Sequence, residues 1–137
     1  MRIKYDLELI KYRTLFENLT GVMVKDCFMK NSSMIVFIVP EKNIGFAIGK
    51  NGANVKKLET VLKKKLKIVE FSNDPVKFIR SLIAPLRPKD IYMEDNIVNI
   101  VPASVADKAQ LIGREGKNLK DIKSIVKRYF DVDVKVV

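Results

Sequence analysis

The residues whose types and spacing could do chemistry form two short Gly-x-x-Gly turns. Gly49-Lys50-Asn51-Gly52 and Gly113-Arg114-Glu115-Gly116 each stand between two predicted helices and carry one cation between the glycines. A helix start after such a turn offers unpaired backbone amides and the positive end of the helix dipole, which together attract an anion such as a phosphodiester. Glycines at both ends leave no Cβ atoms to hold a sugar–phosphate chain away from the backbone. The turns therefore predict phosphate binding.

The two turns lie at the same place in a longer pattern that occurs twice. In each copy an apolar run closed by proline comes first, followed by a predicted helix, the turn and a second predicted helix. One Gly-x-x-Gly turn alone is more easily explained as a corner between helices that needs glycine for its positive φ. Two copies in matched contexts, in a basic chain, favour a shared binding role. The matched segments are 35–40 with 47–58, and 97–102 with 111–122.

The charge of the chain is strongly positive. Its 137 residues include 26 lysines and arginines against 16 acidic residues, a formal net charge of +10. Such a field attracts polyanions, nucleic acid first and an anionic membrane surface second, although it also serves solubility alone. The lysine-rich segment 63–67 fits a solvated helix end, because the predicted helix before it has no spare apolar face to insert into a membrane. We therefore expect nucleic acid and no membrane as partner.

Composition excludes several other classes of protein. Apolar residues make up 47% of the chain, enough for a packed core and too many for a disordered chain. No apolar run approaches the ~18 residues of a membrane span, and charges interrupt any N-terminal signal sequence. Cys27 stands alone, so we expect no intramolecular disulfide and a reducing, cytoplasmic location, with the side chain in the core. The chain has no histidine, so we expect no zinc or other metal site.

An enzymatic function is not expected. The segment from Gly45 to Asn51 superficially resembles a nucleotide-binding P-loop, but three residues separate its glycines where four are needed. Asn51 also stands where a serine or threonine would hold magnesium, and a helix rather than a strand precedes the turn. Without histidine, the scattered carboxylates form no catalytic constellation. We therefore expect neither a cofactor nor a small-molecule substrate.

The elements that must position the turns follow one order in both halves, helix–strand–strand–helix–helix–strand. We expect Asp6 and Ser104 to cap helices, Glu41 to lie in a first helical turn, and 31–33 to form a turn between strands. The polar segment 72–75 predicts a boundary between domains 1–74 and 75–137. The predicted helices are 6–19, 41–48, 53–65, 76–83, 104–112 and 118–130, and the predicted strands are 22–29, 34–39, 67–71, 90–94, 97–101 and 132–136.

The repeated pattern resembles the KH RNA-binding domain. The pattern apolar-Ile-Gly-x-x-Gly-x-x-apolar-x-x-apolar is met from Ala47 to Leu58 and again from Leu111 to Ile122. The resemblance implies an α+β fold of two tandem type II KH domains, each a mixed three-stranded sheet with helices packed on it. In that family the loop clamps the backbone of about four nucleotides of single-stranded RNA against an apolar groove.

Two such domains filling nearly the whole chain resemble the archaeal NusA-like transcription factors. The resemblance implies a role in transcription elongation, termination or antitermination, with RNA polymerase as a further partner. The implied RNA-binding residues surround the two turns. They are Ile48, Gly49, Lys50, Asn51, Gly52, Ala53 and Lys56 in the first copy, and Ile112, Gly113, Arg114, Glu115, Gly116 and Lys117 in the second.

The second turn departs from the first in charge. Glu115 places a carboxylate beside the expected phosphate, where Arg114 and Lys117 offset it in part. We therefore expect the second turn to bind more weakly than the first. The alternative function is a non-catalytic adaptor on RNA polymerase or the ribosome, in which one or both turns are structural.

Overall fold

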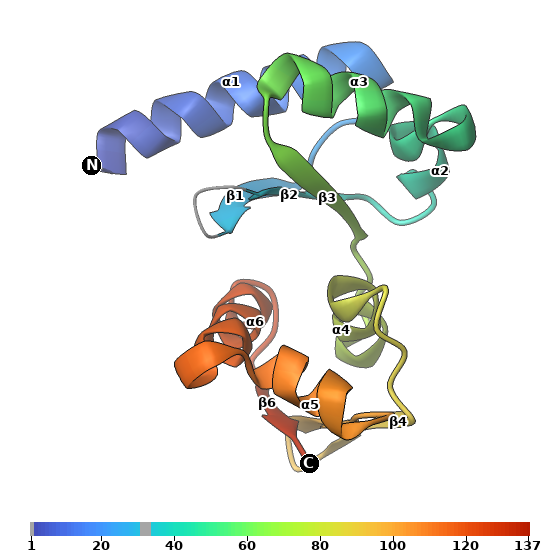
Figure 1. The fold of residues 1–137 in the computed structure, drawn as a ribbon, viewed down its shortest axis with the longest axis vertical. Coiled ribbons are helices and arrows are strands. Elements are labelled where there is room, and N and C mark those ends of the chain that lie inside the picture. The colour runs from blue at the N-terminus through green and yellow to red at the C-terminus, as the bar shows by residue number, and fades with distance from the viewer. Residues whose placement is uncertain (1, 31–33) are drawn as a thin grey trace. The chain divides into compact units, whose positions relative to one another are not determined.

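The computed structural model describes residues 2–30 and 34–137, and the chain folds into two compact units, residues 1–71 and 72–137. Each unit contains one three-stranded sheet with helices on one face (Figure 1). The predicted α+β class and the predicted order of elements are found in both units. The predicted turn at 31–33 lies outside the described residues.

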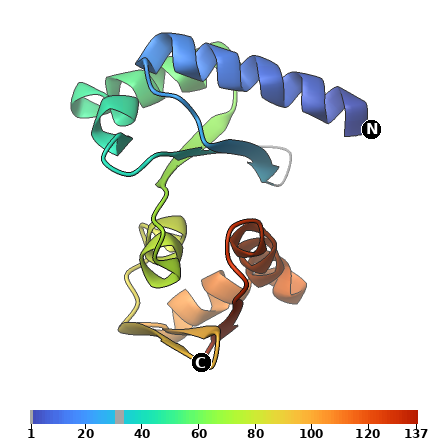
Figure 2. The same ribbon diagram turned by 180° about the vertical axis from the view of Figure 1, so that it is seen from behind.

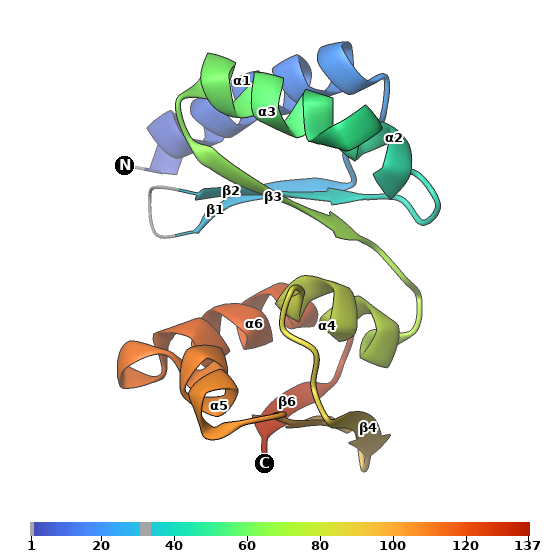
Figure 3. The same cartoon turned by 45° about the vertical axis from the view of Figure 1, so that its right-hand side comes forward.

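The first unit begins with a long helix and continues through two strands, two helices joined by a tight turn, and a closing strand. Central strand β2 pairs antiparallel with β1 and parallel with β3, so the sheet is mixed. Figure 3 shows its helices together on one side of this sheet. The elements are α1 (Arg2–Thr20), β1 (Asp26–Lys30), β2 (Met34–Val39), α2 (Ile44–Ile48), η1 (Lys50–Gly52), α3 (Ala53–Leu62) and β3 (Lys65–Glu70).

The second unit repeats this order, beginning with a much shorter helix, and Figure 2 shows it from behind. Strand β5 lies between antiparallel β4 and parallel β6. Ser104 caps α5 as predicted, since its Oγ accepts the Asp107 N–H at 3.1 Å. The elements are α4 (Pro75–Ile83), β4 (Asp90–Glu94), β5 (Ile97–Val101), α5 (Val105–Ile112), η2 (Arg114–Gly116), α6 (Lys117–Lys127) and β6 (Asp133–Val136).

The core of the first unit lies between its sheet and its helices. Alternation along β2 directs Ile35, Phe37 and Val39 to the helix-covered face, where all three are fully buried. Phe16 of α1 stacks on Phe37 with ring centroids 4.3 Å apart, and Leu58 of α3 is buried in the same cluster. Each such side chain stabilises the fold by roughly 1.5–3 kcal/mol. The core thus fixes α3, the helix that begins at the first Gly-x-x-Gly turn.

The core of the second unit fixes α6 in the corresponding way. Phe78 of α4 is fully buried, and its ring centroid lies 5.6 Å from that of Tyr129 and 5.8 Å from that of Phe130. α6 buries Ile122 and Val126. Edge-to-face and tilted ring pairs of this kind add to the stabilisation from burial, so the C-terminal end of α6 is held against α4.

Strand β1 starts at Asp26 and not at residue 22, so the predicted strand was too long. The reason is that side chains of α1 bind the backbone of Val24. The Val24 N–H donates to the Glu17 carboxylate at 2.7 Å, and the Val24 carbonyl accepts a hydrogen bond from Arg13. These side chains satisfy groups that a strand partner would otherwise pair.

Two predicted helix starts were also wrong. α1 starts at Arg2, so Asp6 lies within the helix and is not its N-cap. α2 starts at Ile44, because Lys42 adopts a positive φ of 75° and breaks the backbone before it. Glu41 therefore lies in the preceding turn rather than in the first turn of α2.

The lysine-rich segment 63–67 is not simply a solvated helix end. α3 ends at Leu62, where Lys63 adopts a left-handed φ of 56°, and β3 begins at Lys65. Lys67 lies within that strand. Its burial, with a smaller contribution from Lys30, lowers the pKa of the Lys67 ammonium to about 8.

The described residues contain neither a candidate membrane span nor a metal-binding cluster. None of the helices there combines the length and apolar character that crossing a membrane requires. Across residues 2–30 and 34–137, no group of three or more cysteine and acidic side chains is placed to hold a metal ion.

The Cys27 side chain packs against the core of the first unit, as its position in a strand predicted. Burial, with a smaller contribution from neighbouring Asp26, raises the pKa of the Cys27 thiol to about 12, while Arg13 acts in the opposite direction. The thiol is therefore protonated at neutral pH. Since the thiolate is the reactive form, a protonated Cys27 is a poor nucleophile in the folded protein.

We expect Cys27 to react with a thiol reagent at neutral pH far more slowly in the native protein than in denaturant. A free thiol titrates near 8.5, so a pKa of about 12 lowers the thiolate fraction by roughly three-thousandfold. Stopped-flow absorbance with an aromatic disulfide measures both rates. Equal rates in buffer and in denaturant would contradict the burial of this side chain.

Candidate nucleic-acid interface

The two Gly-x-x-Gly turns have the same backbone conformation at every position. The first glycine of each turn has a positive φ with an extended ψ. The third residue of the turn, Asn51 or Glu115, and the second glycine are left-handed. The repeat seen in the sequence is therefore a repeat of detailed geometry. The φ and ψ angles are 79° and 168° at Gly49, 54° and 30° at Asn51, 72° and 19° at Gly52, 75° and 174° at Gly113, 56° and 26° at Glu115, and 74° and 12° at Gly116.

The first glycine of each turn is required by both conformation and packing. Gly49 and Gly113 occupy a region of φ and ψ that is essentially restricted to glycine. A Cβ atom at Gly49 would lie 2.9 Å from the side chain of Asn54 and 3.0 Å from its backbone nitrogen. A Cβ atom at Gly113 would lie 2.7 Å from Cβ of Asn118. Any side chain here would push the two helices apart.

The second glycine of each turn is required by conformation alone. Gly52 and Gly116 have left-handed backbones, which L-residues with a Cβ adopt only at a cost. A Cβ atom at either position would meet nothing within 4 Å. The space beside the second glycine is therefore open, so a ligand chain can approach the backbone here.

Asn54 and Asn118 lock the turns, and sequence analysis did not identify them. The Asn54 Nδ2 group donates to the Phe46 carbonyl at 3.0 Å. The Asn118 Nδ2 group donates to the Gln110 carbonyl at the same distance, and to the Leu111 carbonyl at 3.1 Å. Each asparagine thus ties the first turn of one helix to carbonyls at the end of the helix before it. The signal that could have found them is the same residue at the same place in both copies.

The backbone amides at the start of the second helix are not all free, contrary to the sequence-based prediction. Gly52 N–H donates to the Gly49 carbonyl at 3.1 Å, and Ala53 N–H donates to the Lys50 carbonyl. Gly116 N–H likewise donates to the Gly113 carbonyl at 3.2 Å. The turn tightens into a 3-10 helix, which uses these donors internally. These backbone amides are therefore not available to bind an anion.

The side chains around each turn are available to solvent. The predicted cations are all exposed, and within residues 2–30 and 34–137 none of them takes part in an ion pair. The four glycines and Ile112 are half-buried, and Ile48 is 36% exposed. Each isoleucine follows a buried neighbour, Ala47 or Leu111. The exposed residues of the predicted site are Ile48, Lys50, Asn51, Ala53 and Lys56 around the first turn, and Arg114, Glu115 and Lys117 around the second.

The chain belongs to the KH domain family, whose family model matches residues 11–80. This match includes the first turn with the helices on both sides of it. The KH domain is a non-catalytic RNA-binding fold, in which a Gly-x-x-Gly loop meets the nucleic acid backbone.

Relatives from archaea match nearly the whole chain, and each is named "Probable transcription termination protein NusA". The protein of Methanocaldococcus jannaschii is 33% identical, over 99% of this chain and 76% of its own length. That of Methanococcus vannielii is 36% identical, over 100% of this chain and 81% of its own length. A solved structure titled "Crystal structure of APE1850" superposes with a TM-score of 0.69 at 29% identity, covering 95% of this chain and 97% of that one.

We expect Gly49→Ala to destabilise the first unit more than Gly52→Ala. Both substitutions place a Cβ at positive φ, at a cost of about 1 kcal/mol or more, but only the one at Gly49 also clashes with Asn54. Gly113→Ala and Gly116→Ala should show the same order. Denaturant unfolding, followed by circular dichroism, measures the free energy of unfolding of each of the four variants. Equal losses at the first and second glycine would show that the asparagine contact does not constrain the turn.

Proposed function

We propose that the chain binds single-stranded RNA through two tandem type II KH domains, residues 1–74 and 75–137. The observation that carries this proposal is the recurrence of one turn geometry, with exposed cations around it, in a chain of the KH family. The formal net charge of +10 supports a polyanionic partner. RNA is the nucleic acid that this family binds, and its unpaired strands leave bases free to enter a groove.

The sugar–phosphate chain lies along the open side of each turn in this proposal. In the first domain Lys50 and Lys56 pair with phosphate oxygens, and the bare backbone at Gly52 allows close approach. Ile48, which is partly exposed next to the turn, offers an apolar contact to a base. In the second domain Arg114 and Lys117 take the corresponding phosphate contacts. These contacts hold the backbone without selecting a base.

The cellular role that we infer is in transcription. The archaeal relatives carry the name of a termination protein and align with nearly all of this chain. We therefore propose that the chain acts on nascent RNA with RNA polymerase, in elongation, termination or antitermination, in the cytoplasm. The competing function is a non-catalytic adaptor on RNA polymerase or the ribosome, in which one or both turns are purely structural. The carboxylate of Glu115 favours a structural role for the second turn.

We expect the double variant Lys50→Glu/Asn51→Asp to weaken binding to short single-stranded RNA by more than tenfold while leaving the fold intact. Both side chains are exposed, so the change acts on the ligand and not on the core. The slope of log affinity against log salt should also become shallower, by about 0.7 for each phosphate that the variant no longer neutralises. Fluorescence anisotropy at several salt concentrations measures both quantities.

The matched control is Lys11→Glu/Asn18→Asp, which makes the same change in charge at exposed positions of α1. If the turn itself grips the RNA, the control should lose far less affinity. Similar losses in both variants would mean that only overall charge matters. An unchanged affinity in the folded turn variant would favour the adaptor.

We expect Glu115→Gln to tighten RNA binding, because it removes a negative charge beside the proposed phosphate. Unit charges ~4 Å apart near water interact by roughly 1 kcal/mol, which corresponds to about fivefold in affinity. The gain should shrink as salt screens it. Glutamine keeps the left-handed backbone of this position, so thermal stability should not change. If Glu115→Gln leaves the affinity at low salt unchanged, no phosphate is bound beside Glu115 in the second turn.

A further inference from the structure

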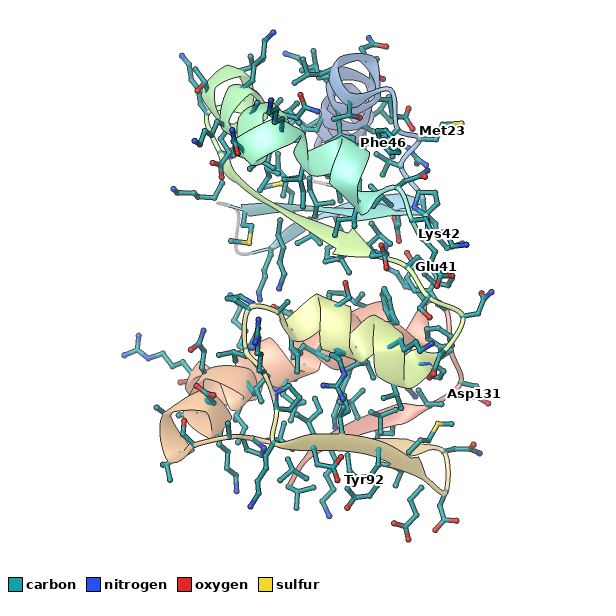
Figure 4. All side chains as sticks on the ribbon, turned by 90° about the vertical axis from the view of Figure 1, so that its right-hand side faces the viewer. Met23, Glu41, Lys42, Phe46, Tyr92 and Asp131 are labelled. Carbon is teal, nitrogen blue, oxygen red and sulfur yellow. The ribbon has the colours of Figure 1, made fainter. Side chains whose placement is uncertain are left out.

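Phe46 is the exposed phenylalanine of this protein. All seven phenylalanines lie in the part of the chain that the structure describes, and the other six are buried or half-buried. Phe46 has 73% of its surface exposed, whereas Phe16, Phe37 and Phe78 have none. It lies on α2, the short helix that ends at the first Gly-x-x-Gly turn, and is labelled in Figure 4. An exposed ring at this place adds nothing to the core of the unit.

The backbone that carries this ring is tied to the turn. The Phe46 carbonyl accepts the Nδ2 hydrogen bond of Asn54 at 3.0 Å, and the same asparagine packs against Gly49. The next residue of α2, Ala47, is fully buried in the core of the unit. The ring therefore projects from a short segment whose position relative to the turn is fixed on both sides. A ligand chain held at the turn would meet a platform that is already in place.

The second turn has no such ring. Gln110 occupies the position of Phe46, because its carbonyl accepts the matching hydrogen bond from Asn118 at 3.0 Å. Gln110 is exposed as well. The two turns thus share a backbone conformation and an asparagine hydrogen bond. They differ because only the first has an aromatic ring beside it.

We propose that Phe46 stacks on an unpaired base of the RNA strand whose phosphates lie at Gly49–Gly52. The inference rests on the proposed function and adds a base contact that the second turn lacks. The occupant is RNA rather than an apolar protein surface, because the ring adjoins a turn bearing the exposed cations Lys50 and Lys56. A nucleic acid strand presents phosphates and base faces alternately at short spacing. Every base has a π face, so the contact strengthens binding with little sequence preference.

The test uses the absence of tryptophan from the natural chain. Phe46→Trp introduces a single tryptophan, whose fluorescence a stacked base quenches. Short single-stranded RNA of randomised sequence should quench it, while an abasic strand of the same length should not. Val61→Trp is the control, since Val61 is also exposed and apolar but lies at the far end of α3. Its fluorescence should stay unchanged with either strand.

Affinity separates this inference from the function on which it rests. Phe46→Ala should weaken binding to the randomised RNA roughly tenfold and leave binding to the abasic strand as in the natural protein. RNA binding that is unaltered in Phe46→Ala, with no quenching in Phe46→Trp, would overturn the stacking role and leave the proposed function standing. Failure of the natural protein to bind either strand would overturn both.

Discussion

The contact between the first glycine of each turn and an asparagine of the following helix is the constraint on which the site depends. A side chain at Gly49 would collide with Asn54, and one at Gly113 would collide with Asn118. The same asparagines donate hydrogen bonds to carbonyls at the end of the preceding helix. Two helices are thereby held in close contact around a turn in which the N–H of the second glycine is paired internally, and the residues between the glycines are exposed to solvent. Both units depend on this arrangement.

On this shared frame the two units carry different side chains. The first presents Lys50 with a neutral amide at Asn51, and an exposed aromatic ring on the helix before the turn. The second presents Arg114 with a carboxylate at Glu115, which also takes up the left-handed conformation that asparagine tolerates better. The two turns thus differ in charge and in the aromatic ring beside them, and not in backbone conformation. In our proposal the first unit is the stronger RNA-binding element and the second supports it.

Much of the fold was predictable because the sequence repeats. Apolar runs ending at Pro40 and Pro102 located both central strands, and paired glycines located both turns. The start of β1 was not predictable, because it depends on two α1 side chains, seven and eleven residues earlier in the chain, that fold back to bind the backbone of Val24. The asparagine locks were missed since asparagine after a glycine turn suggests only a polar helix start. The exposure of Phe46 could not be known either, as apolar residues surround it in the sequence.

The measurement that tests the central claim most directly is nuclear magnetic resonance of the labelled chain during titration with short single-stranded RNA. Glycine amides resonate in a distinctive region, so the two turns can be followed separately. The account predicts that the largest shifts occur at residues 48–56 and 112–117, with the first turn responding at lower RNA concentration. Large shifts confined to other surfaces, such as α1, with both turns unaffected, would contradict it.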